Sequence, residues 1–298
     1  MLIWNGAGDW NNPFKASPGP LMNMTAWYYY AGIVSKTARM LGMREDAARF
    51  QAMAEEVRRR ANGKYLDPKT GIYFGSNDNQ SAQVMPLALG MVPEEAHSLT
   101  LERLLDAIHL RKDHVGTGFV ALPYLLKTLT ETYQTGLANR MVNQQDFPSW
   151  KNLVHDGVLA EDWHGGGAQM PSCGGAIGMW LYQSVLGIRP DPAGPGFKRF
   201  VVAPQPDPAT GLTEAQGWYD SVQGRIVSNW KIADGTLRMD VTIPANTMAT
   251  IRIPTTRPDQ VREGDAPVAE AEGVKVLRKE PGALFVEAGG GEYQFFAR

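Results

Sequence analysis

Cysteine, net charge and long apolar runs are all scarce in this chain of 298 residues. Cys173 is the one cysteine, so no disulfide can form within the chain, and a disulfide-stapled secreted scaffold is excluded. The formal charge of -2 gives no electrostatic reason to expect nucleic acid as a partner. No apolar run reaches the roughly 18 residues of a membrane span, and residues 1–10 lack the pattern of a signal peptide. These absences favour a cytoplasmic protein with neither nucleic acid nor membrane as partner.

The part of the chain before residue 190 has the apolar period of helices. One predicted helix, from Met24, carries apolar residues at intervals of three and four: Trp27, Ala31, Val34, Ala38 and Leu41. Residues 50–61 repeat this spacing, so the two segments predict a helical hairpin with Gly42 as the end of its first helix. Further helices are expected in a short segment bent at Pro86, after Pro93, and over 118–129, 131–143 and 174–186.

The composition changes at GIRPDPAGPGFKRF, residues 187–200, where prolines and glycines end the helical pattern. Beyond it the apolar period is two. GRIVSNWKI and LRMDVTI flank Asp234 and Gly235, a pair typical of a tight hairpin turn, and more strands are expected in MATIRIP, VKVLRK, ALFVEA and EYQFFAR. We therefore expect an α+β chain of two domains, a helical domain over 1–196 and a β-sandwich over 197–298.

Several segments, taken in order, resemble those of bacterial α-L-rhamnosidases, glycoside hydrolase family 78: GDW at 8–10, GTGF at 116–119, FPSW at 147–150, AEDW at 160–163, MWLYQSVLGIRPDPAGPGFKRFVVAPQP from 179 and VTIPANTMATIRIP from 241. The resemblance spans nearly the whole chain. It implies a catalytic barrel of six α/α hairpins followed by a β-sandwich, and this chain resembles the second half of that barrel plus the sandwich. Half a barrel leaves apolar helix faces uncovered, so a homodimer that completes the barrel is expected.

The run DGVLAEDWHGG, residues 156–166, holds the candidate base. Hydrolysis of a glycoside with inversion needs one carboxylic acid to protonate the leaving oxygen and one carboxylate to activate water. Glu161 is the candidate because Trp150 and Trp163 can form an apolar wall beside it and the following glycines leave room for a substrate. The resemblance agrees, since the family motif Trp-Glu-x-Trp carries the general base and places it at Glu161. Ala160 departs from the first Trp of that motif.

The same run also has two other interpretations. It is explained as well by a solvated surface loop, because charged residues are ordinary in glycine-rich loops. A metal site formed by His155, Glu161 and His164 is disfavoured, because their spacings of six and three match no standard zinc pattern. We therefore expect neither a metal nor a cofactor.

The general acid has no inherited position in this chain. In the family it lies upstream of GDW, in an Asp-Glu-Arg motif that this sequence does not contain. Asp9 is the leading local candidate, with Asp162 and Asp146 as weaker ones. The alternative for Asp9 is a structural carboxylate that accepts hydrogen bonds from backbone amides of its loop.

Candidate sugar contacts surround these carboxylates: Trp10, Trp150, Asp162, Trp163 and His164. Trp180 has helical spacing with apolar neighbours and is expected in the core. The family's Asn-His pair before the last barrel helix is replaced by Met170 and Pro171, so one sugar contact is lost. Asn79 and Gln83 are further candidates, unless Ser76 or Asp78 simply caps a helix there.

The resemblance thus implies a glycosidase with a carbohydrate substrate, in which Glu161 assists the attack of water on a glycosidic bond. Two alternatives stay open. The missing acid favours an inactive remnant that binds carbohydrate, and the altered pocket residues favour a glycosidase of changed specificity, such as a β-glucosidase or β-galactosidase.

Overall fold

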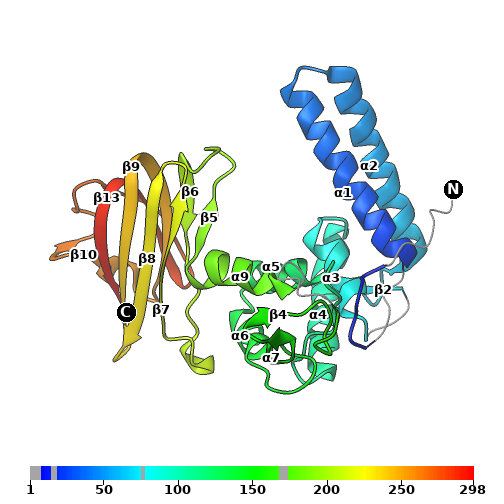
Figure 1. Ribbon diagram of the computed structural model, residues 1–298. Coiled ribbons are helices and arrows are strands. Elements are labelled where there is room, and N and C mark those ends of the chain that lie inside the picture. Colours follow the sequence, from blue (N-terminus) through cyan, green and yellow to red (C-terminus); the bar gives the residue numbers. More distant parts are fainter. Residues whose placement is uncertain (1–7, 15–18, 75–77, 168–173) are drawn as a thin grey trace. The chain divides into compact units, whose positions relative to one another are not determined.

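The structure, a computed structural model, describes residues 8–14, 19–74, 78–167 and 174–298 (Figure 1). Cys173, Ser76, Met170 and Pro171, for which the sequence made predictions, lie outside these residues. Contacts divide the chain into two compact units, Met1–Glu131 with Arg140–Ala176 and Thr132–Asn139 with Ile177–Arg298. We call the first the helical unit and the second the β unit. Their order agrees with the expected helical part followed by a β-rich part.

The structural division falls before residue 196, the end of the predicted first domain. The last helical turn belongs to the β unit because two side chains of the sheet bind its backbone. The Trp230 indole N–H donates to the Val185 carbonyl at 2.8 Å. The hydroxyl of Ser228 donates to the Leu186 carbonyl at 2.7 Å. The change in composition at residues 187–200 marks the start of the strands. The two hydrogen bonds from Trp230 and Ser228 attach the turn before it to the β unit.

The helical unit begins with an antiparallel pair of long helices, α1 (Gly19–Met40) and α2 (Arg44–Tyr65) (Figure 1). Gly42, with φ of +75°, ends α1 as expected, because this left-handed conformation suits glycine. Of the five apolar residues that the spacing places on one face, Ala31 and Ala38 are buried, whereas Trp27, Val34 and Leu41 are 36, 41 and 69 % exposed. The small residue Ser35 is buried beside the two alanines. They let the two helices approach closely, and the Ser35 hydroxyl donates to the Ala47 carbonyl at 2.8 Å.

The remaining elements of the helical unit are short: β1 (Leu66–Asp67), β2 (Ile72–Tyr73), α3 (Gln80–Ala88), α4 (Glu94–Leu110), α5 (Leu122–Glu131), α7 (Trp150–Leu153), β3 (Val154–His155) and β4 (Val158–Leu159). Helix α6 (Thr135–Val142) crosses from one unit to the other. Pro86 lies inside α3 and Pro93 immediately precedes α4, as the sequence predicts. The helix expected from residue 118 begins only at Leu122, because side chains of Asp9 and Gln80 bind the backbone of 116–121 and hold it as a loop.

Helix α3 is buried on every side, and its polar residues hold the loops around it. Gln80, Ser81 and Gln83 have no exposed surface. Gln80 accepts from the Gly116 N–H at 2.7 Å and donates to the His114 carbonyl at 2.9 Å. Because buried polar side chains need hydrogen-bond partners, those of α3 bind the neighbouring loops and hold them in place.

After its part of α6, the β unit continues from Ile177 within α9 (Ala176–Trp180) into a π-helical turn (Leu181–Val185). Its strands are β5 (Ile188–Pro190), β6 (Arg199–Val202), β7 (Glu214–Ser221), β8 (Gly224–Ala233), β9 (Thr236–Pro254), β10 (Arg262–Glu263), β11 (Ala266–Pro267), β12 (Val274–Glu280) and β13 (Ala283–Ala297). Two 3₁₀ turns lie at Pro208–Thr210 and Pro258–Gln260. The predicted hairpin turn joins β8 and β9, with Asp234 and Gly235 both at positive φ. Trp180 is 3 % exposed and lies in the core, as expected.

The two halves of each of the long strands β9 and β13 pair with different neighbours in the nine-stranded sheet. The sequence predicts two separate strands within each of β9 and β13. Each is one continuous strand, because the residues between the two predicted segments remain paired or form a bulge. The first half of β9 pairs with β8 and with the second half of β13, which also pairs with β10. The second half of β9 pairs with β6 and with the first half of β13, which also pairs with β12. A register shift between Gly289 and Gly291 separates the two halves of β13.

Candidate functional site

A short hairpin in the helical unit presents Glu161. Strands β3 and β4 pair antiparallel, and Asp156 and Gly157, with φ of 51° and 77°, make the two-residue turn. The Ala160 N–H donates to the Leu153 carbonyl at 2.7 Å, which fixes the chain just before Glu161. The Asp-Gly pair is the local signal for this hairpin, although from the sequence the run was expected only as part of a loop.

The Glu161 side chain is half-buried and lies against Gly167. A Cβ atom at position 167 would come within 2.7 Å of Glu161 Oε2 and would force the carboxylate aside. The side-chain amide of Asn11 donates to the Glu161 carbonyl oxygen at 3.1 Å. Glu161 is therefore held at its backbone from one side and has room for its carboxylate because a glycine lies on the other.

The two predicted contacts that follow Glu161 have different surroundings. Asp162 Oδ1 accepts from the N–H groups of His164 at 2.7 Å and Gly166 at 3.2 Å, so this carboxylate closes the turn after Glu161. The His164 ring is exposed and stacks on Phe147 with ring centroids 4.6 Å apart. Phe147 was not singled out from the sequence, although it lies in the FPSW segment. Sugar binding by Asp162 and His164 stays a prediction.

Four aromatic rings form a row beside this turn. Trp10 lies 6.0 Å from Phe119, which stacks on Trp163 at 5.2 Å, and Trp163 meets Trp150 edge to face at 5.9 Å. Trp10 is 39 % exposed, whereas Trp150 is 5 % and Trp163 0 % exposed. Trp10 is therefore the exposed end of the row, and the buried rings of Trp163 and Trp150 pack beyond Phe119 at its other end. Their predicted contact with a sugar stays a prediction, and Phe119, which lies in the GTGF segment, was not singled out from the sequence.

The candidate acid Asp9 is 3 % exposed and bound by protein donors. Its Oδ2 accepts from the Ser81 hydroxyl and from the Gly118 N–H at 2.5 Å, and its Oδ1 accepts from the Ala121 N–H at 2.9 Å. Burial raises the pKa of the Asp9 carboxyl above its ordinary value, against the effect of these hydrogen bonds. A raised pKa suits a proton donor, whereas the three bonds suit the structural alternative. Proton donation by Asp9 stays a prediction.

Asp146, a weaker candidate acid, is exposed and paired with a histidine. Its Oδ1 lies 3.0 Å from His114 Nε2, and this hydrogen bond lowers the pKa of the Asp146 carboxyl. A carboxyl with a lowered pKa is ionised at neutral pH and is poorly suited to donate a proton. The pair instead joins the segments that carry Phe119 and Phe147.

Replacement of Asp9 by asparagine is expected to destabilise the fold by about 1–3 kcal/mol, because the new amide would direct its own N–H groups at buried donors. Since burial raises the Asp9 pKa, its contribution to stability is fully present below the unfolded pKa and declines as the pH rises through the folded one. The introduced amide does not titrate, so the destabilisation should be larger at pH 4 than at pH 7. Urea unfolding at both pH values measures this, and equal values would contradict it.

The Gly118→Ala variant should lose about 3 kcal/mol of folding free energy. A Cβ atom at Gly118 would lie 2.2 Å from the Trp10 carbonyl oxygen and 2.5 Å from that of Asp9, and both are backbone atoms that cannot turn away. The control is Gly32→Ala inside α1, where nothing lies within 4 Å and where alanine favours the helix. Thermal unfolding of both variants tests this, and a Gly118→Ala variant as stable as the native chain would show that the loop yields easily.

Asn79 and Gln83, the further candidate sugar contacts, are buried and bound within the protein. Asn79 is the residue that caps α3, since its side chain accepts from the Ala82 N–H at 3.0 Å, so a cap by Asp78 is a wrong prediction. Gln83 exchanges hydrogen bonds with the Tyr73 backbone at 3.1 and 3.2 Å. The Asn79 side chain therefore stabilises the start of α3, and the Gln83 side chain attaches α3 to the backbone of β2.

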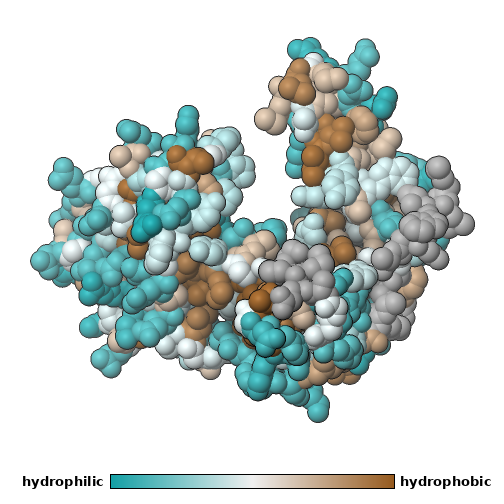
Figure 2. Space-filling view, in the orientation of Figure 1, coloured by the Kyte–Doolittle hydropathy of each residue, from teal (hydrophilic) through white to brown (hydrophobic). Residues whose placement is uncertain are grey.

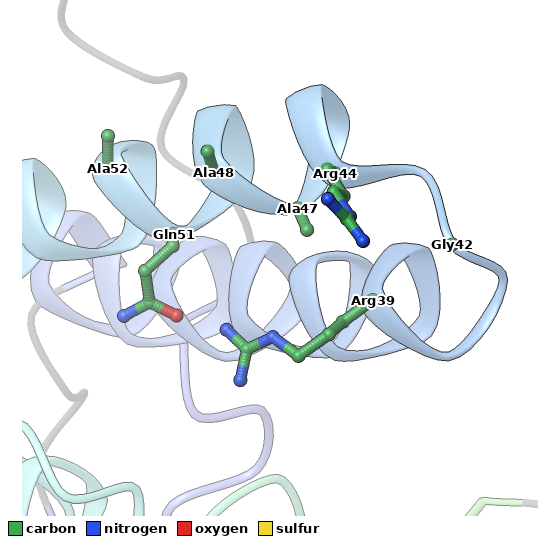
Figure 3. A pocket seen from close by; sticks show the side chains of 7 residues that line it. All are labelled: Arg39, Gly42, Arg44, Ala47, Ala48, Gln51 and Ala52. Carbon is green, nitrogen blue, oxygen red and sulfur yellow. The ribbon is translucent and has the colours of Figure 1, made fainter.

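Other candidate sites are weaker. Within the described residues, no group of three or more His, Cys, Asp or Glu side chains is arranged to hold a metal ion. A hollow at the joined ends of α1 and α2 is lined by Arg39, Gly42, Arg44, Ala47, Ala48, Gln51 and Ala52 (Figure 3). It contains guanidinium groups and no carboxylate, so it cannot supply an acid and a base for hydrolysis. None of the helices described has both the length and the apolar character needed to cross a bilayer.

Two models of one protein family match most of the chain. The model of the bacterial alpha-L-rhamnosidase 6 hairpin glycosidase domain matches residues 2–185, and that of the bacterial alpha-L-rhamnosidase C-terminal domain matches 187–266. The chain belongs to the bacterial α-L-rhamnosidase family, which confirms the resemblance seen in the sequence.

Individual relatives give the extent of the match. An α-L-rhamnosidase of Streptomyces avermitilis is 29 % identical over 98 % of this chain, and one of Formosa agariphila is 27 % identical over 99 %. The crystal structure of the Streptomyces avermitilis α-L-rhamnosidase with L-rhamnose covers 98 % of the chain at 27 % identity, with a TM-score of 0.86. The structure of the α-L-rhamnosidase from Dictyoglumus thermophilum covers 97 % at 26 % identity, with a TM-score of 0.83. The chain spans only 28 to 34 % of the length of these proteins.

Proposed function

We propose that this chain carries the base of a glycoside hydrolase of the α-L-rhamnosidase type, and that Glu161 activates the attacking water. The observation that carries the proposal is the position of Glu161. This residue is half-buried, its carboxylate lies against Gly167, and it precedes Trp163 of the aromatic row by two residues. The α-L-rhamnosidases that share its fold, one of them solved with L-rhamnose, support a rhamnoside as the substrate.

The chemistry assigned to Glu161 is a proton abstraction. Its carboxylate takes a proton from water while the water oxygen bonds to the anomeric carbon, and the bond from that carbon to the leaving oxygen breaks. The leaving oxygen needs a proton from an acid on the opposite side, and Asp9 is the proposed donor within this chain. Trp10, the exposed end of the aromatic row, is proposed to support the apolar face of the sugar ring.

A panel of nitrophenyl glycosides tests the base separately from the acid. Nitrophenolate is a stable anion that leaves without protonation, so its release depends on water activation even where the acid is weak. We expect release from 4-nitrophenyl α-L-rhamnoside to exceed that from the β-glucoside and β-galactoside. A preference for either β-glycoside would establish changed specificity, and no release from any sugar would overturn the proposed hydrolase activity of the chain.

A carbohydrate-binding protein without turnover is the second candidate. It is favoured by the three protein donors that occupy Asp9, because a carboxyl so engaged is poorly placed to protonate a leaving group. Titration of tryptophan fluorescence with L-rhamnose distinguishes the two. Saturable binding without nitrophenol release supports the second candidate, whereas release supports the first.

A homodimer is proposed to cover the outer face of α1. Tyr30, Met40 and Leu41 on and beside this helix are 63, 87 and 69 % exposed, and Figure 2 shows apolar residues on the surface of the α1–α2 hairpin. Such surfaces are typical of interfaces, and small residues of α2 such as Ala48 and Ala52 leave room for a second helix. Light scattering should give twice the chain mass, and a strict monomer at micromolar concentration would contradict the dimer. The cytoplasmic location stays a prediction that cell fractionation tests.

A further inference from the structure

Residues 9–12 connect three parts of the helical unit. Asp9 binds Ser81 of α3 and the loop at Gly118 and Ala121. The Trp10 carbonyl accepts from the Phe119 N–H at 2.9 Å. The Asn12 side chain donates to the Gly116 carbonyl at 2.9 Å. The backbone of this segment is therefore fixed by bonds on both sides of Asn11.

Asn11 itself reaches a different part of the chain. Its Nδ2 donates to the Glu161 carbonyl oxygen at 3.1 Å, a contact between residues 150 positions apart. Asn11 has φ of 60°, a left-handed conformation that asparagine and aspartate adopt more readily than other residues with side chains. Its side-chain amide can thus extend from a fixed backbone to the turn that follows β4.

The hydrogen bond from Asn11 lies in the segment of main chain that positions Glu161, the candidate base. Ala160 is held by the Leu153 carbonyl, and Asp162 closes the turn that follows. The Glu161 carbonyl lies between these two fixed points, and the Asn11 amide binds it there from the segment that carries Asp9 and Trp10. Loss of that bond would loosen the peptide unit that carries the carboxylate.

We infer that Asn11 is a positioning residue for Glu161, which holds the main chain of the candidate base at the place where its carboxylate meets the attacking water. The inference rests on the proposed function, because it takes Glu161 as the base. It also makes a claim about the local structure of residues 160–167 that holds without any turnover.

The test is Asn11→Asp. Aspartate keeps the size of the side chain and tolerates the left-handed backbone, but at neutral pH it places a carboxylate oxygen against the carbonyl oxygen of Glu161. Asn11→Gly removes the side chain without this repulsion. The matched control is Asn62→Asp in α2, where an asparagine amide likewise donates to a distant carbonyl, that of Met91, at 2.8 Å.

Hydrogen exchange measured by mass spectrometry gives the first result. In both Asn11 variants, amides of residues 160–167 should exchange about tenfold faster, the loss expected for one hydrogen bond, while the Asn62 control leaves this segment unchanged. In Asn11→Asp, lowering the pH to 4 should slow the exchange relative to native, because a protonated aspartate can donate to the Glu161 carbonyl. Unchanged exchange of residues 160–167 in both Asn11 variants would overturn the inference.

Kinetics give the second result. With 4-nitrophenyl α-L-rhamnoside, kcat of Asn11→Asp should fall about 10²-fold with little change in KM, because a base displaced by a fraction of an ångström still leaves the binding surfaces intact. Faster exchange with an unchanged kcat would overturn the role of Asn11 in positioning the base. Faster exchange in a chain whose native form has no turnover would support the structural contact and contradict the proposed function instead.

Discussion

The Glu161→Gln variant should release nitrophenol from 4-nitrophenyl α-L-rhamnoside about 10³-fold more slowly than the native chain, with KM nearly unchanged. Glutamine keeps the shape of the side chain beside Gly167, so the fold and the binding surfaces are retained, but an amide cannot accept the proton of water. Initial rates over a range of substrate concentrations measure both constants.

The matched control is Glu131→Gln at the end of α5, where the carboxylate pairs on the surface with Lys127 at 2.7 Å. Its activity should equal that of the native chain. Glu161→Ala adds a chemical test, because azide can occupy the vacated space and attack the anomeric carbon without losing a proton. Azide should then restore turnover and yield a glycosyl azide. A Glu161→Gln variant with native kcat would show that another group activates the water.

The Trp163→Ala variant should lose about 3–5 kcal/mol of folding free energy, the range for removal of a large buried aromatic side chain. Trp163 has no exposed surface and touches Phe119 on one side and Trp150 on the other. Its indole nitrogen is buried and has no hydrogen-bond partner among the described residues, so the loss comes from packing. Urea unfolding followed by circular dichroism measures it.

Trp218→Ala on β7 is the control for this prediction. Trp218 is 53 % exposed and stacks with Arg225 at 5.0 Å, so its removal should cost no more than about 1 kcal/mol. An equal loss from both variants would mean that the aromatic row does not stabilise the helical unit more than a surface contact does.

Periodicity and local turn chemistry were enough to predict most elements of the fold. The period of three to four gave α1 and α2, Gly42 gave the end of α1, and the Asp-Gly turn gave the hairpin of β8 and β9. The apolar face predicted for α1 is buried only in part, at Ala31 and Ala38, because the helix is apolar on more than one side. Periodicity then does not say which side meets α2, and the close approach of two helices favours Ala31 over Val34.

The candidate site was predictable in part, because its members come from segments far apart in the chain. The motifs drew attention to Trp10, Glu161 and Trp163, but not to the stacking of Phe119 between two of them. Asn11 has no local signal at all. Its importance follows from a contact across 150 positions that only the folded chain reveals. The β3–β4 hairpin did have a signal, and its strands were too short for alternation to be recognised.

The course of β9 and β13 has a consequence for how the β unit unfolds. One half of β9 pairs with β8 and the other half with β6, while β13 pairs with β9 along both halves, so the two groups of strands are joined through continuous chains. Heat should therefore melt both groups of strands together, in a single sharp transition with coincident loss of near-ultraviolet and far-ultraviolet dichroism.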